Sequence, residues 1–337
     1  MAVRLKDIAR DLGVSTVTVS KVLRNRKDVG EKTRQRVLKR MEELQYKPNL
    51  IARALISGRT ANVGLVVPDL LHPYFGEVAK SLGAVLREHD RALLLASSED
   101  DPEIEQREIR ALLTRGVDML LISSCQRKLQ NIFKVGEKQT PILLVDRNFP
   151  LLDAHYVGSD DFKIGEIATE HLLETGRKRI AHIGASHLST GHERMRGYSE
   201  TLQRHRAIVP PEYVLMHERF EETGISAGQK AMQHLLKLNH RPDAVFCYND
   251  LTAIGAIEAV LEAGLRVPED VAIVGCGNFR YAQYLRVPLT SVDQSTDQIG
   301  RTAGEEVIRL LDDPEEPARS ILIQPHLRVR ASSWKPA

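Results

Sequence analysis

The sequence predicts a small all-α head followed by a two-lobed α/β body made of parallel, doubly wound sheets. Three observations predict this fold class. Residues 5–24 contain two short amphipathic segments that meet at a glycine. From residue 62 onward, short strands rich in Val, Leu and Ile alternate with amphipathic helices, a pattern typical of parallel sheets. These units are too numerous for one small sheet, so we expect two lobes that divide near Ser159.

Residues 5–24 (LKDIARDLGVSTVTVSKVLR) are expected to form a helix-turn-helix. Gly13 supplies the permissive backbone of the turn, and Ser15 caps the second helix. Val19 and Val22 of this second helix face inward at helical spacing. The first helix contributes a complementary apolar face, made of Leu5, Ile8, Ala9 and Leu12.

The outer face of the second helix carries side chains that packing does not require. At about 3.6 residues per turn, Val17, Lys21 and Arg24 lie opposite Val19. A recognition helix presents its outer and N-terminal side chains to base edges in the major groove. Thr16 and Val17 can contact thymine methyl groups, and Lys21 can reach guanine or a phosphate. The alternative is a solvated helix that carries one exposed valine.

Charge is segregated between the head and the body. Residues 1–60 contain 15 Lys and Arg against 6 Asp and Glu, a net charge of +9, whereas the whole chain carries only +2. A basic end on an acidic body is expected when that end neutralises phosphates, so we expect the head to bind double-stranded DNA. The expected phosphate contacts are Lys6, Arg24, Lys32, Arg34 and Arg53.

Residues 48–60 are interpreted as a hinge helix and linker between head and body. Pro48 suits the start of a new helix, and Gly58 ends it. A helix of about eight residues is marginal in water, so it forms only when something packs on it. The segment is either a flexible linker that docks on the body or a helix that pairs with its twin and inserts Leu55 into the minor groove.

The body is expected to alternate between strands and helices. The expected strands are 62–68, 92–97, 118–124, 141–146, 155–159, 179–184, 243–249 and 271–276. The expected helices are 75–89, 103–115, 161–175, 191–206, 224–238, 250–264 and 296–311. Ligands bind such folds beyond the carboxyl ends of the strands. The acidic run at residues 99–105 is most simply a solvated loop and helix start.

Composition and motifs argue against several other classes. No segment approaches the roughly 20 apolar residues of a membrane span, and the N-terminus is charged where a signal peptide is apolar, so a cytoplasmic protein without membrane contact is expected. The cysteines are too far apart for a zinc pattern, so no metal is expected. Residues 224–228 match G-x-S-x-G, but no buried strand precedes them, and residues 275–277 lack the third glycine of a dinucleotide fingerprint. We therefore expect no catalysis and no cofactor.

Taken in order, the motifs resemble the LacI/GalR family of bacterial transcriptional regulators over essentially the whole chain. The motifs are KDIARDLGVSTVTVSKVLR, YKPNLIARAL, GLVVPDLLHPYF, VDRNFP, ERMRGY, FCYNDLTAIGA and LRVPEDVAIVGCGN. The resemblance implies a repressor that works as a homodimer, or a dimer of such dimers, on a near-palindromic operator. It implies that Thr16, Val17 and Lys21 contact bases and that Leu55 is the minor-groove wedge.

The resemblance also implies the domain boundaries. The head is 1–47, the hinge 48–60, and the effector-binding and dimerisation domain 61–337. Within that domain, the first lobe comprises about 61–158 and 293–317, and the second about 159–291 and 319–332. The lobes are similar to those of periplasmic sugar-binding proteins. A solute-binding protein and an α/β enzyme that uses the same cleft are the alternatives.

A small-molecule effector, sugar-like or nucleobase-like, is implied in the cleft between the lobes. The candidate contacts are Asp69, Tyr74, Phe75, Asp146, Arg194, Phe220, Asn249, Asp250 and Gln294. Aromatic faces stack on a ring, while carboxylates, amides and arginine bind its polar edge. The structural alternatives are that Phe75 and Phe220 belong to the core and that Asp69 and Asp250 cap helices.

One position departs from the family pattern. Gly277 stands where many relatives have an aspartate that binds effector hydroxyls. This absence makes a standard hexose contact doubtful. The alternatives are a phosphorylated or otherwise anionic effector, or a substitute contact from Asn278.

Overall fold

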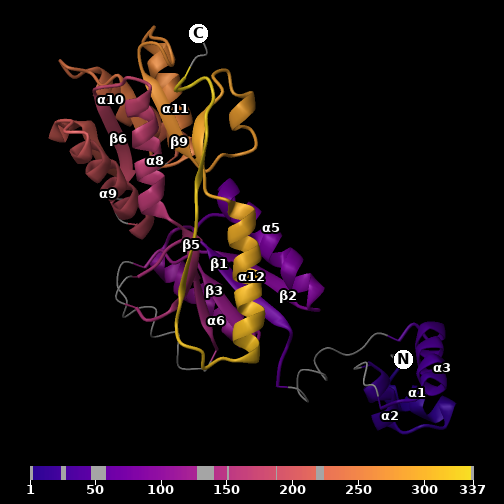
Figure 1. The fold of residues 1–337 in the computed structure, drawn as a ribbon. Coiled ribbons are helices and arrows are strands. Elements are labelled where there is room, and N and C mark those ends of the chain that lie inside the picture. The colour runs from indigo at the N-terminus through magenta and orange to yellow at the C-terminus, as the bar shows by residue number, and fades with distance from the viewer. Residues whose placement is uncertain are drawn as a thin grey trace. The chain divides into compact units, whose positions relative to one another are not determined.

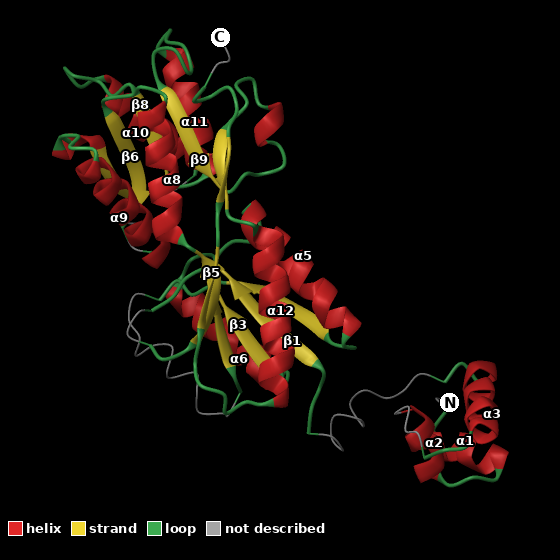
Figure 2. Cartoon of the chain, in the orientation of Figure 1, coloured by secondary structure: helices red, strands yellow, loops and turns green. Residues whose placement is uncertain are grey.

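The computed structural model describes residues 3–23, 28–46, 58–126, 140–149, 152–186, 188–217 and 224–334. The chain divides into two compact units, Met1–Thr60 and Ala61–Ala337. The first unit is helical and the second contains two sheets with helices on their faces (Figure 1, Figure 2). No helix in the described ranges is long and apolar enough to cross a membrane.

The N-terminal unit contains α1 (Leu5–Leu12), α2 (Thr16–Leu23) and α3 (Glu31–Glu43). Gly13 ends α1 with a positive φ of 64°, and the Ser15 hydroxyl caps α2 by accepting from the Thr18 amide at 3.0 Å. The helix-turn-helix is therefore confirmed. Its core consists of Ile8, Ala9, Val19, Val22, Val37 and Met41. The last two come from α3, a helix that was not predicted.

The first sheet is entirely parallel, with the order β11-β5-β4-β3-β1-β2. Its strands are β1 (Asn62–Val67), β2 (Ala92–Ser97), β3 (Met119–Ile122), β4 (Ile142–Val145), β5 (His155–Ser159) and β11 (Ser320–Ile323). Two helices, α5 (Pro73–Glu88) and α12 (Thr296–Asp312), cover one face, where Val63 and Leu65 of β1 point. The other face, which includes Val66, packs against α6 (Pro102–Thr114).

The second sheet has the order β12-β10-β9-β8-β6-β7, and only the β10–β12 pair is antiparallel. Its strands are β6 (Ile180–Ala185), β7 (Val214–His217), β8 (Ala244–Cys247), β9 (Ala272–Cys276), β10 (Thr290–Asp293) and β12 (His326–Arg328). The pair α8 (Asp161–Glu174) and α9 (Ser189–Arg204) covers one face. The pair α10 (Ile225–Leu236) and α11 (Asp250–Glu262) covers the other, and two short 3-10 turns, Pro211–Tyr213 and Ala282–Tyr284, complete this lobe.

Every strand and helix expected in the body is present, with ends that agree within two residues. The structure adds β7, β10, β11 and β12, and these additions correct the lobe boundaries. Because β11 pairs with β5 at Ile321 and Val157, residues 320–323 lie in the first lobe and not in the second. Because β10 pairs with β9, the chain re-enters the first lobe only after Asp293.

The two lobes are joined by three chain crossings. They follow β5, β10 and β11, where one sheet ends and the next element belongs to the other lobe. The crossings contact one another: the Ser159 hydroxyl donates to the Gln294 carbonyl at 3.4 Å, and the Gln324 amide donates to Asp160 at 3.5 Å. This junction lies at the carboxyl end of β5 and therefore borders the region where a ligand is expected.

Candidate functional site

The outer face of α2 presents the three residues predicted to read bases. Val17 is 61% exposed and Thr16 is also exposed, whereas Val19 on the opposite side is fully buried. The Lys21 ammonium forms a 2.6 Å ion pair with Asp28. Thr16 and Val17 thus lie on the face that a recognition helix presents to base edges.

The expected phosphate contacts are partly described. Lys6 on α1 and Lys32 on α3 are exposed, and Arg34 is partly buried, with its Nε 3.8 Å from Glu31. Two other arginines of the head have structural roles that were not predicted: Arg36 donates to the Leu12 carbonyl, and Arg40 pairs with Asp11 at 2.6 Å. The remaining predicted DNA contacts, Arg24, Arg53 and Leu55, lie outside the described residues.

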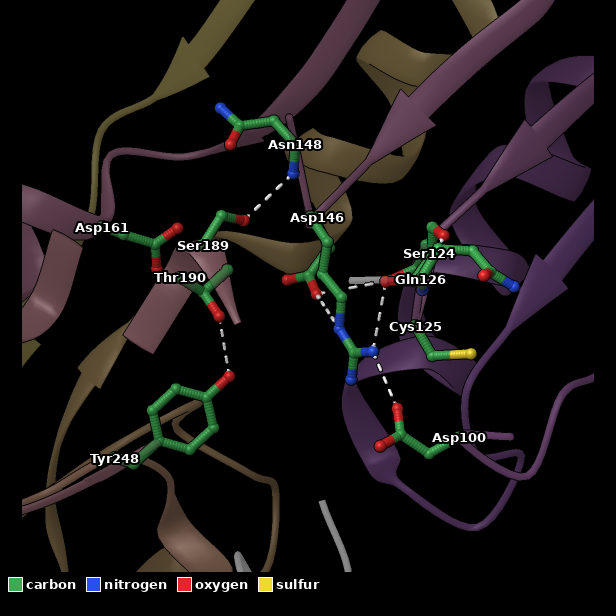
Figure 3. Close-up of polar contacts among 12 residues, drawn as sticks. Asp100, Ser124, Cys125, Gln126, Asp146, Asn148, Asp161, Ser189, Thr190 and Tyr248 are labelled. Atoms are coloured by element: carbon green, nitrogen blue, oxygen red, sulfur yellow. Dashed lines mark hydrogen bonds and ion pairs between the residues drawn. The ribbon is translucent and has the colours of Figure 1, made fainter. Parts of the chain in front are cut away.

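A cavity of about 880 Å³ opens between the two lobes at the carboxyl ends of β3, β4, β5 and β6. In Figure 3, Asp161, Ser189 and Thr190 of the second lobe lie on one side, opposite Ser124, Cys125 and Gln126 of the first. The lobes touch where the Asn148 amide donates to the Ser189 hydroxyl at 3.1 Å. The lining consists of Ser124, Cys125, Gln126, Arg147, Asn148, Phe149, Tyr156, Ser159, Asp160, Asp161, Phe162, Ser186, Leu188, Ser189, His192, Glu193 and Leu322.

Arg147, directly after β4, places a buried guanidinium in this lining. Its Nη1 donates to Asp100 Oδ1 at 2.9 Å and to the Ser124 carbonyl at 3.3 Å, and its Nε lies 3.9 Å from Asp146 Oδ2 (Figure 3). Asp146 adopts a positive φ of 67°, and Tyr156 donates to its carbonyl at 2.9 Å. Burial raises the pKa of Asp146, against the opposing effect of the nearby arginines.

The loop that follows β3 is held by a buried carboxylate. Glu105 on α6 has no exposed surface; its carboxylate accepts from the Ser124 hydroxyl at 2.8 Å and the Cys125 amide at 2.6 Å. The prediction of a solvated acidic run at 99–105 was therefore wrong for Glu105, and for Asp100, which pairs with Arg147. It was right about the helix start, because Asp101 caps α6.

Arg194 on α9 forms a second buried ion pair beside the cavity. Its Nε and Nη2 each lie 2.8 Å from Asp161 Oδ1, and its Nη1 donates to the Tyr248 carbonyl at 2.7 Å. The guanidinium also stacks on the Tyr248 ring at 4.6 Å, and the Tyr248 hydroxyl bonds to Thr190 at 2.8 Å. Burial raises the pKa of Asp161 to about 7, although Arg194 opposes this shift.

The aromatic pair Tyr74 and Phe75 belongs to the core of the first lobe and does not line the cavity. The two rings meet edge-on, with centroids 5.1 Å apart. Phe279, from the loop after β9 of the second lobe, packs into the same cluster and contacts His72 edge-on at 5.4 Å. The His72 ring centroid in turn lies 5.6 Å from that of Phe75, with the two rings tilted. Phe75 therefore belongs to the core, which was the structural alternative stated for it.

Asp250 and Asn249 have structural partners at the start of α11. Asp250 is fully buried; one of its oxygens accepts from the Ser291 hydroxyl of β10 at 2.6 Å, and the other accepts from the Phe279 amide in the loop after β9 at 2.9 Å. Burial raises the pKa of Asp250 to about 6. Asn249, rather than Asp250, caps α11 by accepting from the Thr252 amide at 2.8 Å. Its buried Nδ2 makes no hydrogen bond and is the part of this pair that can still serve a ligand.

The other effector candidates are dispersed. Asp69 accepts from the Leu71 amide at 2.7 Å in a tight turn, and Gln294 lies buried at the lobe crossing. Asn278, considered as a substitute contact, instead binds Asp293 at 3.0 Å and Arg330 at 2.6 Å. Phe220 lies outside the described residues. The cavity lining thus contains none of the described candidates, although Asp146 and Arg194 contact residues that do line it.

Comparisons with known proteins agree with this arrangement. Residues 4–49 match the model for bacterial regulatory proteins of the lacI family, and residues 169–333 match a periplasmic binding protein-like domain. The HTH-type transcriptional repressor PurR of Aliivibrio fischeri (strain MJ11) is 32% identical over 335 residues, which cover 97% of each chain.

Two solved structures are similar over nearly the whole chain. The transcriptional regulator CelR–cellobiose complex has 29% identity and a TM-score of 0.73, covering 98% of this chain and 99% of that one. The lac repressor dimer bound to operator and the anti-inducer ONPF has a TM-score of 0.86 over 99% and 100% of the two chains; at 22% identity it shows the shared fold. This chain belongs to the lacI family of bacterial regulatory proteins and is a DNA-binding transcriptional regulator.

Proposed function

We propose that this protein is a cytoplasmic repressor that binds operator DNA as a homodimer and is controlled by a small molecule in the cavity between its lobes. The observation that carries the proposal is the outer face of α2, where Val17 is 61% exposed, in an N-terminal segment (residues 1–60) that carries a net charge of +9. The similar PurR is named a repressor, and CelR was solved with cellobiose.

In this proposal, Thr16, Val17 and Lys21 select the operator sequence. Lys21 exchanges its 2.6 Å ion pair with Asp28 for a contact to guanine or a phosphate. Lys6, Arg24, Lys32, Arg34 and Arg53 bind phosphates and position the helix without reading sequence. Leu55 inserts into the minor groove from the hinge segment.

The effector acts on the relative orientation of the two lobes. The cavity is lined by both lobes, which are joined by three crossings and by contacts such as that between Asn148 and Ser189. A ligand that bridges both linings favours one orientation over the other and shifts the population toward it. The first lobe follows the hinge segment in the chain, so this shift changes the cost of ordering that segment on DNA. Asp146, Arg194 and the free amide of Asn249 remain the best placed of the predicted effector residues.

Selection from a random duplex pool tests the DNA-binding assignment. The wild-type chain is expected to enrich one near-palindromic sequence at moderate salt. Lys21→Ala should change the base preference at one position in each half-site, at a cost of about 1–3 kcal/mol, if Lys21 contacts guanine. Lys39→Ala removes the same charge from an exposed position of α3 and is the matched control, which should keep the wild-type preference.

The outcomes distinguish the roles. If Lys21→Ala weakens all sequences equally, Lys21 contacts a phosphate and not a base. If the wild-type pool enriches nothing, the assignment of α2 as a recognition helix is wrong.

A further inference from the structure

We propose that Asp28 is a specificity determinant for DNA: it accepts a hydrogen bond from a cytosine amino group, so that Lys21 and Asp28 together read one oriented G·C pair. This inference rests on the proposed contact between Lys21 and guanine and extends it to the other base of the pair. The residues predicted from the sequence to contact DNA are cationic, hydroxylic or apolar. Asp28 adds an anionic acceptor to this set.

Asp28 lies beside the outer face of α2. Its Oδ2 accepts from the Lys21 ammonium at 2.6 Å, and the Lys21 and Asp28 side chains are 44% and 56% exposed. The backbone that follows Asp28 is anchored, because Val29 packs against the core of the head and α3 begins at Glu31. The carboxylate is therefore held next to any group that the Lys21 ammonium contacts.

Other acidic residues of the head bind its helical framework. Asp7 accepts from the Arg4 amide at the start of α1, Asp11 and Glu43 pair with Arg40, and Glu31 accepts from Gln35 on α3. Asp28 differs because its partner belongs to the outer face of α2. A carboxylate close to the phosphates of DNA opposes binding through its charge. A base contact made by Asp28 compensates this cost.

A G·C pair presents two complementary groups side by side in the major groove. Guanine offers the acceptors O6 and N7, and cytosine offers the N4 amino donor. A hydrogen bond between the two bases joins O6 and N4, so these atoms lie about 2.9 Å apart, close to the 2.6 Å between Lys21 Nζ and Asp28 Oδ2. An ammonium and a carboxylate at this spacing match the acceptor and the donor of one G·C pair.

The other base pairs suit these two charges less well. A reversed C·G pair places the amino donor against the ammonium and the guanine acceptors against the carboxylate. An A·T pair also offers one donor and one acceptor, but thymine has a methyl group where guanine has N7, and adenine N7 repels a carboxylate that approaches N6. The Lys21–Asp28 pair therefore favours one orientation of G·C and penalises its reverse.

The ion pair between Lys21 and Asp28 can be exchanged on DNA at little cost. Exposed ion pairs contribute little to stability, because solvent screens them. On the preferred base pair, Lys21 exchanges the carboxylate for guanine and Asp28 exchanges the ammonium for cytosine N4. On a wrong base pair, at least one of the two charges is desolvated without a matching base group, which is unfavourable. Discrimination follows from this difference.

Binding of the full chain to its selected operator and to single-base-pair variants of it tests the proposal. The position examined is the one at which Lys21→Ala changes the preference in the duplex selection, and the wild type should prefer G·C there in one orientation. Asp28→Ala should reduce this preference at least about fivefold. It should also raise the affinity for unrelated duplex DNA, because a negative charge near the phosphates is removed.

Glu42→Ala is the matched control. It removes the same charge from an exposed position of α3 and should keep the wild-type base preference. Circular dichroism of both variants checks that the head remains folded.

A base analogue identifies the atom that Asp28 contacts. Replacing the cytosine at this position by 2-pyrimidinone removes the N4 amino group. The replacement should weaken binding of the wild type at least about fivefold more than binding of Asp28→Ala, because the variant has no carboxylate contact to lose. The weaker base pairing of the analogue affects both proteins equally and cancels in the comparison.

Two results would overturn this proposal and leave the proposed DNA binding intact: an Asp28→Ala chain that keeps the wild-type preference at this position, and an analogue that weakens both proteins equally. Uniform weakening by Lys21→Ala, or a preference for a base pair other than G·C, would overturn it as well. If the wild type selects no sequence, the assignment of α2 as a recognition helix is wrong and this inference fails with it. Failure of the Asp28 contact alone is therefore distinguishable from failure of the proposed function.

Discussion

Gly277→Ala is expected to destabilise the body because the methyl group has no space and the backbone is strained. Gly277 has a φ of 130°, which L residues rarely adopt, and an added Cβ would lie 2.7 Å from Cε1 of Phe279. The ring cannot easily retreat: the Phe279 amide is held by Asp250 at 2.9 Å and the ring packs on His72. Backbone strain of this kind costs about 1–3 kcal/mol, and overpacking adds about 1–3 kcal/mol.

A double-mutant cycle with Phe279→Ala separates the two contributions. Urea unfolding of the full chain, followed by circular dichroism, gives the free energy of unfolding of each variant. Phe279→Ala alone removes a buried ring and should cost about 3–5 kcal/mol. In that background the clash is absent, so Gly277→Ala should cost less than in the wild type, by about 1–3 kcal/mol. The strain from φ remains in both backgrounds.

If the losses of unfolding free energy from Gly277→Ala and Phe279→Ala simply add in the double variant, the steric part of this reasoning is wrong. A Gly277→Ala chain as stable as the wild type would refute both parts. The same geometry applies to Gly277→Asp, which would introduce the aspartate that the family resemblance leads us to expect at this position. The aspartate Cβ would contact the Phe279 ring, and the residue would have to adopt the same positive φ. A loss of stability should therefore accompany any change in ligand preference.

Two further predictions concern the second lobe and its helix contacts. His182 is buried between Tyr198 and Phe246, and burial lowers its pKa from 6.5 to about 4. Between these two pH values the unfolded chain binds a proton at His182 that the folded chain does not bind. The free energy of unfolding therefore falls as the pH drops from 6.5 to 4. His182→Phe should remove this contribution and reduce the slope of the unfolding free energy against pH by up to about 1.4 kcal/mol per pH unit. His234→Phe, at an exposed position, is the control and should leave the slope unchanged. Parallel curves of unfolding free energy against pH for the wild type and His182→Phe would contradict the assignment. Gly165→Ala should lower the melting temperature sharply, because its Cβ would collide with the backbone carbonyl of Arg194, where α8 meets α9. Gly76 is an exposed position of α5 with open space where a Cβ would lie, so Gly76→Ala should be neutral or stabilising by about 0.5–1 kcal/mol. Equal losses at both glycines would show that helix contact does not decide the cost.

The sequence predicted the elements whose apolar pattern is continuous and missed those stabilised by polar side chains or by an edge position. Strand β10 begins with Thr290 and Ser291, which are fully buried because their hydroxyls bond to Arg330 and Asp250. No apolar run marks such a strand. Strands β11 and β12 are short edge strands with exposed side chains, so their assignment to a lobe depends on pairing that only the structure shows. Helix α3 was missed although Val37 and Met41, four residues apart, carry the signal.

The exposed face of α2 could be derived from spacing because it lies within one helix. The arrangement around the cavity could not, because its ion pairs join residues far apart in the chain. Arg147 and Asp100 are 47 residues apart, and Arg194 and Asp161 are 33 apart. The resemblance located Asp146 and Arg194 close to the cavity, but it gave no sign that Glu105 shapes the lining or that Asp100 neutralises its arginine.

The departure at Gly277 has a packing explanation in this chain. The loop after β9 carries Phe279 into the core of the first lobe, where its ring meets His72 within the cluster that includes Tyr74 and Phe75. A residue with a Cβ at position 277 would meet that ring, so glycine and Phe279 fit as a pair. Among the described residues, packing against Phe279 therefore explains the glycine at position 277 without reference to the ligand.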